Sequence, residues 1–124
     1  MRPSSITLNQ ERIGKQSKAG DRRTRLRLTC KGSANIRFHP AGPDVAGSIE
    51  DLSAGGCSIK SDFAISASKL HSQIEVRLDV QRHKLSLCGI LCHVKDECRL
   101  GIEFVQVNEY RAEQIQRLMA DLRF

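Results

Sequence analysis

Two short groups of polar residues carry the chemistry that this sequence offers. Arg23 and Arg27 lie four positions apart in an arginine-rich stretch. Further along the chain, Asp51, Ser53 and Gly56 form the pattern D-x-S-x-x-G. A guanidinium group pairs with phosphate and with the acceptor edge of guanine, whereas a carboxylate accepts hydrogen bonds from the N–H groups of that base. Arginines combined with an acid therefore suit a small anion that carries bases.

The arginine pair keeps its geometry in either regular structure. Residues four positions apart share one face of a helix, and they also share one side of an extended strand. Arg22 precedes the pair and adds a third guanidinium group. Alone, this spacing is weak evidence, because a solvated basic linker has the same composition.

The second pattern is more specific. Asp51 and Ser53 lie at the end of a predicted strand and, being two positions apart, project from the same face. Gly55 and Gly56 permit a tight turn and a close approach of the backbone to a ligand. The alternative is an Asp/Ser turn whose side chains cap backbone N–H groups. The presence of both patterns, in order and in one short chain, favours a binding site.

Short segments of strand character must position these residues. Residues 74–80 alternate strictly between apolar and charged types, which predicts a half-buried strand with one wet face. Turn residues such as Pro40–Pro43 separate the segments. This spacing indicates a compact antiparallel sheet, and closure into a small barrel removes its exposed edges. The predicted strands cover residues 26–30, 34–38, 45–52, 57–60, 74–80, 85–94 and 100–107.

The hydrophobic period changes near the C-terminus. Asn108 is a predicted N-cap. Ile115, Leu118, Met119 and Leu122 then follow at the spacing of one helical face. We therefore expect an amphipathic helix that packs on one end of the barrel.

The net charge of +6 is concentrated at the N-terminus. Residues 1–32 hold nine of the 20 Lys/Arg but only two of the 14 Asp/Glu. We expect residues 1–20 to form a flexible basic arm and residues 21–124 to form one domain. No apolar run is long enough to cross a bilayer, and the first twenty residues lack a secretory core. These features predict a soluble, cytoplasmic protein.

The cysteines and histidines do not suggest catalysis. Five cysteines in a chain without a signal peptide indicate reduced thiols rather than a disulfide framework. Cys88, Cys92 and Cys98 form no C-x-x-C pair, so buried thiols that pack as small hydrophobic groups are favoured over a zinc site. No histidine accompanies Asp51 and Ser53 in a triad pattern. We expect no enzyme activity, no metal and no cofactor.

The two patterns, together with the segment Leu100-Gly101-Ile102-Glu103-Phe104 and the helix that follows it, resemble the PilZ domain, a bacterial receptor module for cyclic di-GMP. The resemblance covers about residues 20–122. It implies a mainly β fold, a six-stranded antiparallel barrel with a C-terminal α-helix, in agreement with the predicted elements. It also assigns the arginines to phosphates and guanine edges, and the D-x-S-x-x-G residues to a guanine at the barrel surface. The implied ligand-binding residues are Arg22, Arg23, Arg27, Asp51, Ser53 and Gly56.

The resemblance implies a receptor or adaptor. Cyclic di-GMP would order the arginine segment over the barrel and signal to a protein partner in motility, pilus or exopolysaccharide control. In the family, the residue before the arginines, here Asp21, bears on whether one or two ligand molecules bind, so the stoichiometry stays open. One alternative is a basic barrel that binds single-stranded nucleic acid, although an aromatic content of 4% offers little base stacking. The other is a PilZ-like adaptor without nucleotide binding.

Overall fold

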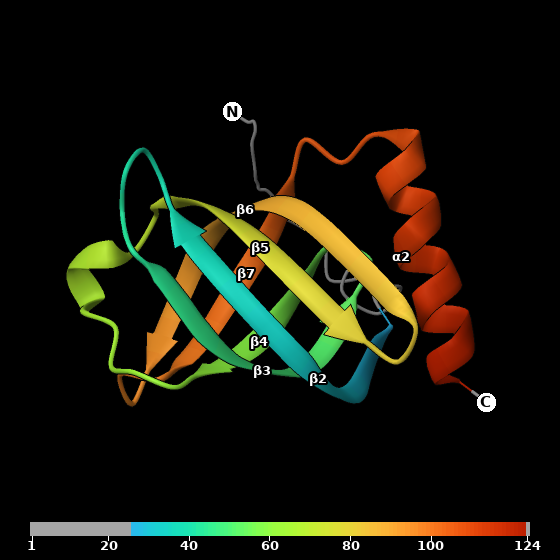
Figure 1. The fold of residues 1–124 in the computed structure, drawn as a ribbon, viewed down its shortest axis with the longest axis horizontal. Coiled ribbons are helices and arrows are strands. Elements are labelled where there is room, and N and C mark those ends of the chain that lie inside the picture. Colours follow the sequence, from blue (N-terminus) through green and yellow to red (C-terminus); the bar gives the residue numbers. More distant parts are fainter. Residues whose placement is uncertain (1–25, 124) are drawn as a thin grey trace, which may run out of the picture.

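The computed structural model describes residues 26–123. They form a closed antiparallel barrel of six strands with one C-terminal helix, as predicted (Figure 1). The order around the barrel is β2-β3-β4-β7-β6-β5, so β4 pairs with β7 and β2 pairs with β5 although neither pair is consecutive in the chain. The strands are β2 (Arg27–Phe38), β3 (Asp44–Ser53), β4 (Gly56–Ser61), β5 (Gln73–Val80), β6 (His83–Lys95) and β7 (Arg99–Val105).

The barrel is filled by alternating aliphatic side chains. On β5, the side chains of Ile74, Val76, Leu78 and Val80 are at most 2% exposed, and the charged residues between them face outward. Burial of each such side chain stabilises the fold by about 1.5–3 kcal/mol. The same alternation on the other strands produces one continuous core with a polar outer surface, on which the candidate site lies.

Strand β2 differs from the sequence prediction. Residues 26–30 and 34–38 were expected to be separate strands, but Arg27–Phe38 is one continuous strand. The register with β3 shifts between Thr29 and Gly32, so a bulge carries the strand through the polar residues that interrupt its alternation. The strand pairs with β3 along most of its length and with β5 along its second half.

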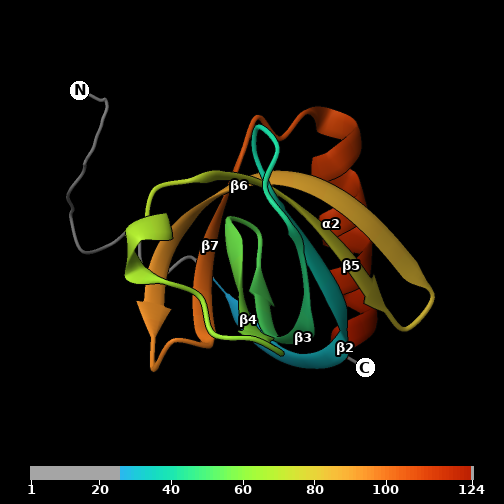
Figure 2. The same cartoon turned by 60° about the vertical axis from the view of Figure 1, so that its left-hand side comes forward.

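Helix α2 (Glu109–Leu122) covers one end of the barrel (Figure 1). Figure 2, in which the opposite end comes forward, shows α2 behind the strands. Its buried face consists of Ile115, Leu118 and Met119, which join the barrel core as predicted. At the N-terminal end, the Asn108 side chain accepts a hydrogen bond of 2.8 Å from the backbone N–H of Arg111. The predicted N-cap is therefore confirmed.

Loss of this N-cap should weaken the attachment of α2. We expect Asn108→Ala to lower the free energy of unfolding by about 1 kcal/mol, because a helix N–H group loses its acceptor. Asn108→Asp keeps an acceptor at this position and should remain close to the wild type. Urea unfolding followed by circular dichroism compares the variants, and equal stability of wild type and Asn108→Ala would contradict the assigned cap.

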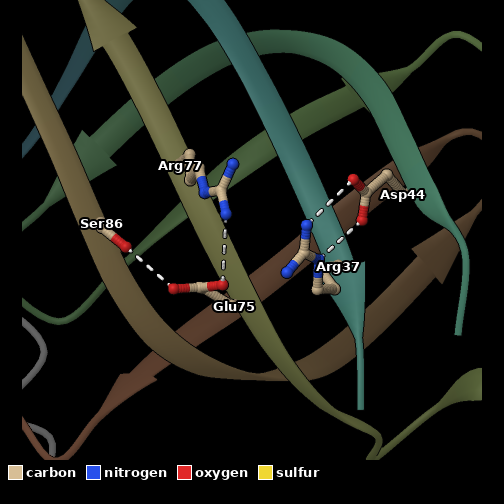
Figure 3. Close-up of polar contacts among 5 residues, drawn as sticks. All are labelled: Arg37, Asp44, Glu75, Arg77 and Ser86. Carbon is tan, nitrogen blue, oxygen red and sulfur yellow. Dashed lines mark hydrogen bonds and ion pairs between the residues drawn. The ribbon is translucent and has the colours of Figure 1, made fainter. Parts of the chain in front are cut away.

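The outer face around β2, β3 and β5 carries charges in balanced pairs (Figure 3). Arg37 Nε donates to Asp44 Oδ1 at 2.9 Å, and this hydrogen bond lowers the pKa of Asp44 below its ordinary value. Arg77 lies 3.8 Å from Glu75, which also accepts a hydrogen bond of 3.1 Å from Ser86. Positive charge on this side of the barrel is thus matched locally by carboxylates.

Among residues 26–123, there is no helix of the length and apolarity that a membrane crossing requires.

Candidate ligand-binding site

An ion pair joins the two predicted motifs. Arg27 begins β2 opposite Ser53, and Thr29 lies opposite Asp51, so Arg27 and Asp51 are diagonal neighbours on the outer face. Arg27 Nη1 donates to Asp51 Oδ1 at 2.5 Å and to Ser58 Oγ at 3.3 Å. The structure therefore brings one predicted arginine into contact with the predicted acid.

The pair retains donors and an acceptor for a ligand. Both contacts of Arg27 use Nη1, and within the described part of the chain its Nε and Nη2 have no hydrogen-bond partner, nor has Asp51 Oδ2. The side chains of Arg27 and Asp51 are 55% and 26% exposed. Guanine offers the complementary groups, namely acceptors at O6 and N7 and donors at N1 and N2. The arrangement can thus bind either edge of a guanine.

Ser53 shares the outer face with Asp51 but is covered. Leu52 between them is fully buried in the core, which confirms that Asp51 and Ser53 project from the same side of β3. Ser53 is only 3% exposed, and its Oγ donates to the carbonyl oxygen of Gly56 at 3.3 Å. Ser53 therefore fixes the β3–β4 turn, and Asp51 is the accessible member of the motif.

Gly56 follows the β3–β4 turn and meets the backbone of β7. Glycine was predicted here for a tight turn and for a close approach of the backbone to a ligand, but no glycine among residues 26–123 has a positive φ. Gly56 lies opposite Ser53 on β3 and Glu103 on β7. A Cβ atom at this position would collide with the backbone carbonyl oxygen of Ile102. Glycine is required because the β7 backbone passes too close for any side chain.

A groove of about 280 Å³ crosses the outer face of β4 and β7 beside the ion pair. Gly101 forms part of the floor of the groove, and because it has no side chain it leaves this space open. It lies opposite Ser58 on β4 and His93 on β6. A Cβ atom on Gly101 would approach the His93 side chain to 3.0 Å, so His93 leans over this glycine. The groove is lined by Arg27, Ser53, Gly55, Gly56, Cys57, Ser58, Cys92, His93, Gly101, Ile102 and Glu103.

Eight of the groove residues were not predicted as site residues, namely Gly55, Cys57, Ser58, Cys92, His93, Gly101, Ile102 and Glu103. The alternation in Leu100–Phe104 places Gly101 and Glu103 on the outer face, and this signal was present in the sequence. Only the pairing of β4 with β7 brings that face to Asp51.

A larger cavity of about 570 Å³ lies on the other side of the β3–β4 turn, between that turn and α2. Its lining is mainly apolar, and Gly55 borders both this cavity and the groove. Leu26, the first described residue, forms part of its wall. The cavity thus adjoins the N-terminal end of the described residues.

Arg27 is the one predicted arginine that lies within the described residues. The ligand was expected to order the arginine segment, Arg27 included, over the barrel. This expectation is wrong for Arg27, which is the first residue of β2 and already contacts Asp51. Arg22, Arg23 and the predicted arm of residues 1–20 lie outside the described residues.

The five cysteines differ in burial. Cys30 and Cys57 are buried, and burial raises the pKa of both thiols, with a further contribution from the Asp51 carboxylate. Burial, followed by the nearby Glu103, raises the pKa of Cys92 to about 11. Cys88 is exposed, which contradicts the prediction for that residue, because it lies on the outward face of β6 opposite Glu75. Within residues 26–123, no group of three or more His, Cys, Asp or Glu side chains could hold a metal ion.

The family model of the PilZ domain matches residues 21–121. A closed six-stranded barrel with a C-terminal helix is the architecture described above, and the chain belongs to the PilZ domain family. No curated protein matches the sequence significantly.

Solved structures of PilZ domains share this fold. The PilZ domain of CeSA from a cellulose-synthesizing bacterium is 19% identical, with a TM-score of 0.67 over 80% of this chain and 99% of that chain. The PilZ domain of YcgR from Escherichia coli, solved with c-di-GMP, is 16% identical, with a TM-score of 0.69 over 82% of this chain and 92% of that one. The inhibitor of motility MotI/DgrA from Bacillus subtilis is 11% identical, with a TM-score of 0.61 over 94% of this chain and 58% of that one. At these identities the likeness shows the fold.

Proposed function

We propose that this chain is a receptor that binds cyclic di-GMP on the outer face of its barrel. The observation that carries the proposal is the exposed Arg27–Asp51 pair beside a groove whose floor is kept open by Gly101. Membership in the PilZ family and the likeness to a PilZ domain solved with this ligand support the choice of nucleotide. The proposal involves ligand binding only and no chemical step.

The hydrogen-bonding groups of Arg27 and Asp51 that have no partner among residues 26–123 define how a guanine would bind. Nε and Nη2 of Arg27 would donate to O6 and N7, or Asp51 Oδ2 would accept from N1–H and N2–H. An exposed ion pair contributes less than about 1 kcal/mol, whereas each hydrogen bond to a charged group contributes about 1.5–3 kcal/mol. The hydrogen bonds gained with the ligand would therefore contribute more free energy than is lost if the Arg27–Asp51 pair rearranges. Arg22 and Arg23 would supply further contacts to the phosphates.

The proposed output is a change in the surface offered to a protein partner. Arg22 and Arg23 precede Leu26, which lines the cavity between the β3–β4 turn and α2. A ligand held by these arginines and by Asp51 would fix the N-terminal segment against the barrel. A partner that binds the ligand-bound surface and the ligand-free surface with different affinities would then respond to the ligand concentration. Motility, pilus function and exopolysaccharide synthesis are the outputs that the resemblance implies.

Titration calorimetry tests the proposal. We expect the purified protein to bind cyclic di-GMP with low-micromolar or tighter affinity and to discriminate against cyclic di-AMP. Adenine lacks the O6 acceptor and the N1–H and N2–H donors, so neither Arg27 nor Asp51 finds its full set of partners. Absence of binding, or equal affinity for both dinucleotides, would contradict the proposed site.

The single-stranded nucleic-acid alternative finds little support in the described surface. Phe63 and Tyr110 are its large exposed aromatic side chains, and neither lines the groove. In such proteins, stacking of bases on aromatic side chains contributes about 1–3 kcal/mol per base. A labelled oligonucleotide that binds with steep salt dependence and is not displaced by cyclic di-GMP would favour this alternative.

A further inference from the structure

Three exposed cations lie side by side on the face that carries the groove. Lys60 on β4 lies directly opposite Arg99 on β7, and Arg99 lies directly opposite Lys95 on β6. Residues directly opposite each other in a sheet have Cβ atoms about 4.5–5.5 Å apart. We refer to Lys60, Arg99 and Lys95 as the basic row.

The basic row does not stabilise the sheet. Like charges placed directly opposite each other destabilise a strand pair. Among the described residues, none of the three forms an ion pair within 4.0 Å, and neither do Asp96 and Glu97 of the adjoining β6–β7 turn. The opposite side of the barrel, where the arginines lie beside carboxylates, shows the usual compensation (Figure 3). The row therefore presents three neighbouring cations that form no ion pair with a carboxylate among the described residues.

The basic row continues the groove. Each of its members is two residues along its strand from a residue of the groove, on the same face and about 7 Å away. Gly101 has no side chain that could separate Arg99 from the groove floor. Glu103, the exposed acid of the groove, lies on the other side of Gly101. The neighbouring pairs are Ser58 and Lys60, Gly101 and Arg99, and His93 and Lys95.

We infer that the basic row is a second phosphate subsite, which binds the phosphate of the bound dinucleotide on the side of the groove away from Arg27. The inference rests on the proposed function. The fork of Arg99 can bind a phosphate through two hydrogen bonds, and the lysines on either side add positive charge. A ligand that lies across Ser58 and Gly101 would then have cations at both ends, with Arg27 at one and the row at the other.

A matched pair of double variants tests the subsite. Lys60→Gln/Arg99→Gln removes one lysine and one arginine from the row, and Arg82→Gln/Lys84→Gln removes the same two charges near the β5–β6 turn, away from the groove. We expect the first variant to bind cyclic di-GMP about fivefold to twentyfold more weakly, with a smaller dependence on salt concentration. The second should bind like the wild type. Calorimetry at two salt concentrations measures both quantities.

The outcomes separate this inference from the proposed function. If Lys60→Gln/Arg99→Gln binds like the wild type while Arg27→Ala weakens binding, the basic row is not a subsite and the receptor proposal stands. If the wild type does not bind cyclic di-GMP, both fail. The exchange Lys60→Arg/Arg99→Lys keeps the charges and should retain binding. Thermal unfolding should show no loss of stability in the glutamine double variant, because it relieves repulsion between opposite residues.

Discussion

Replacement of Arg27 by alanine is expected to weaken cyclic di-GMP binding by about 10- to 100-fold, equivalent to one or two hydrogen bonds to a charged group. The same change should lower the free energy of unfolding by less than about 1 kcal/mol, because the Arg27–Asp51 pair is exposed to solvent. The two effects differ in size because the guanidinium group contacts the barrel through Nη1 only. Titration calorimetry and urea unfolding of the same protein sample measure them.

Arg37→Ala is the matched control for this prediction. Arg37 also lies on β2 and pairs with an aspartate of β3, but at the other end of the strand pair and outside the groove. The control should lose its ion pair and keep its ligand affinity. Equal affinities of Arg27→Ala and the wild type, or equal losses in both variants, would show that Arg27 does not contact the nucleotide.

The fold was predictable wherever a local pattern reports burial directly. The strict alternation of residues 74–80 corresponds to β5, and the helical spacing of Ile115, Leu118 and Met119 corresponds to the buried face of α2. The continuity of β2 was not predictable in the same way. Its bulge places consecutive polar residues inside a strand, and local alternation cannot distinguish such a bulge from a turn.

The candidate site was predictable as a set of residue types but not as a surface. The D-x-S-x-x-G pattern located the partly exposed Asp51, and the arginine spacing located its ion-pair partner Arg27. The burial of Ser53 and the reason for Gly56 depend on how the β3–β4 turn packs against β7. That contact joins strands that are not consecutive in the chain, and no local sequence pattern records it. The basic row escaped prediction for the same reason, since Lys60, Arg99 and Lys95 are neighbours only in the closed barrel.

The second large effect is expected at Gly56. Gly56→Ala should lower the free energy of unfolding by about 2–4 kcal/mol, because its Cβ atom would overlap the carbonyl oxygen of Ile102. The overlapping atom belongs to the backbone, so relief requires β4 and β7 to separate. These strands form one of the two pairings between non-consecutive strands that close the barrel. Urea unfolding followed by circular dichroism measures the loss.

Gly101→Ala supplies the comparison, because this glycine also lies in the groove but faces a side chain. Its Cβ atom would lie 3.0 Å from His93, which is exposed and can turn aside, so the cost should stay below about 1 kcal/mol. A large loss of stability at Gly56 and a small one at Gly101 would show that the motif glycine is required for barrel closure. If Gly56→Ala instead unfolds like the wild type and loses only nucleotide affinity, the glycine makes room for the ligand and not for β7.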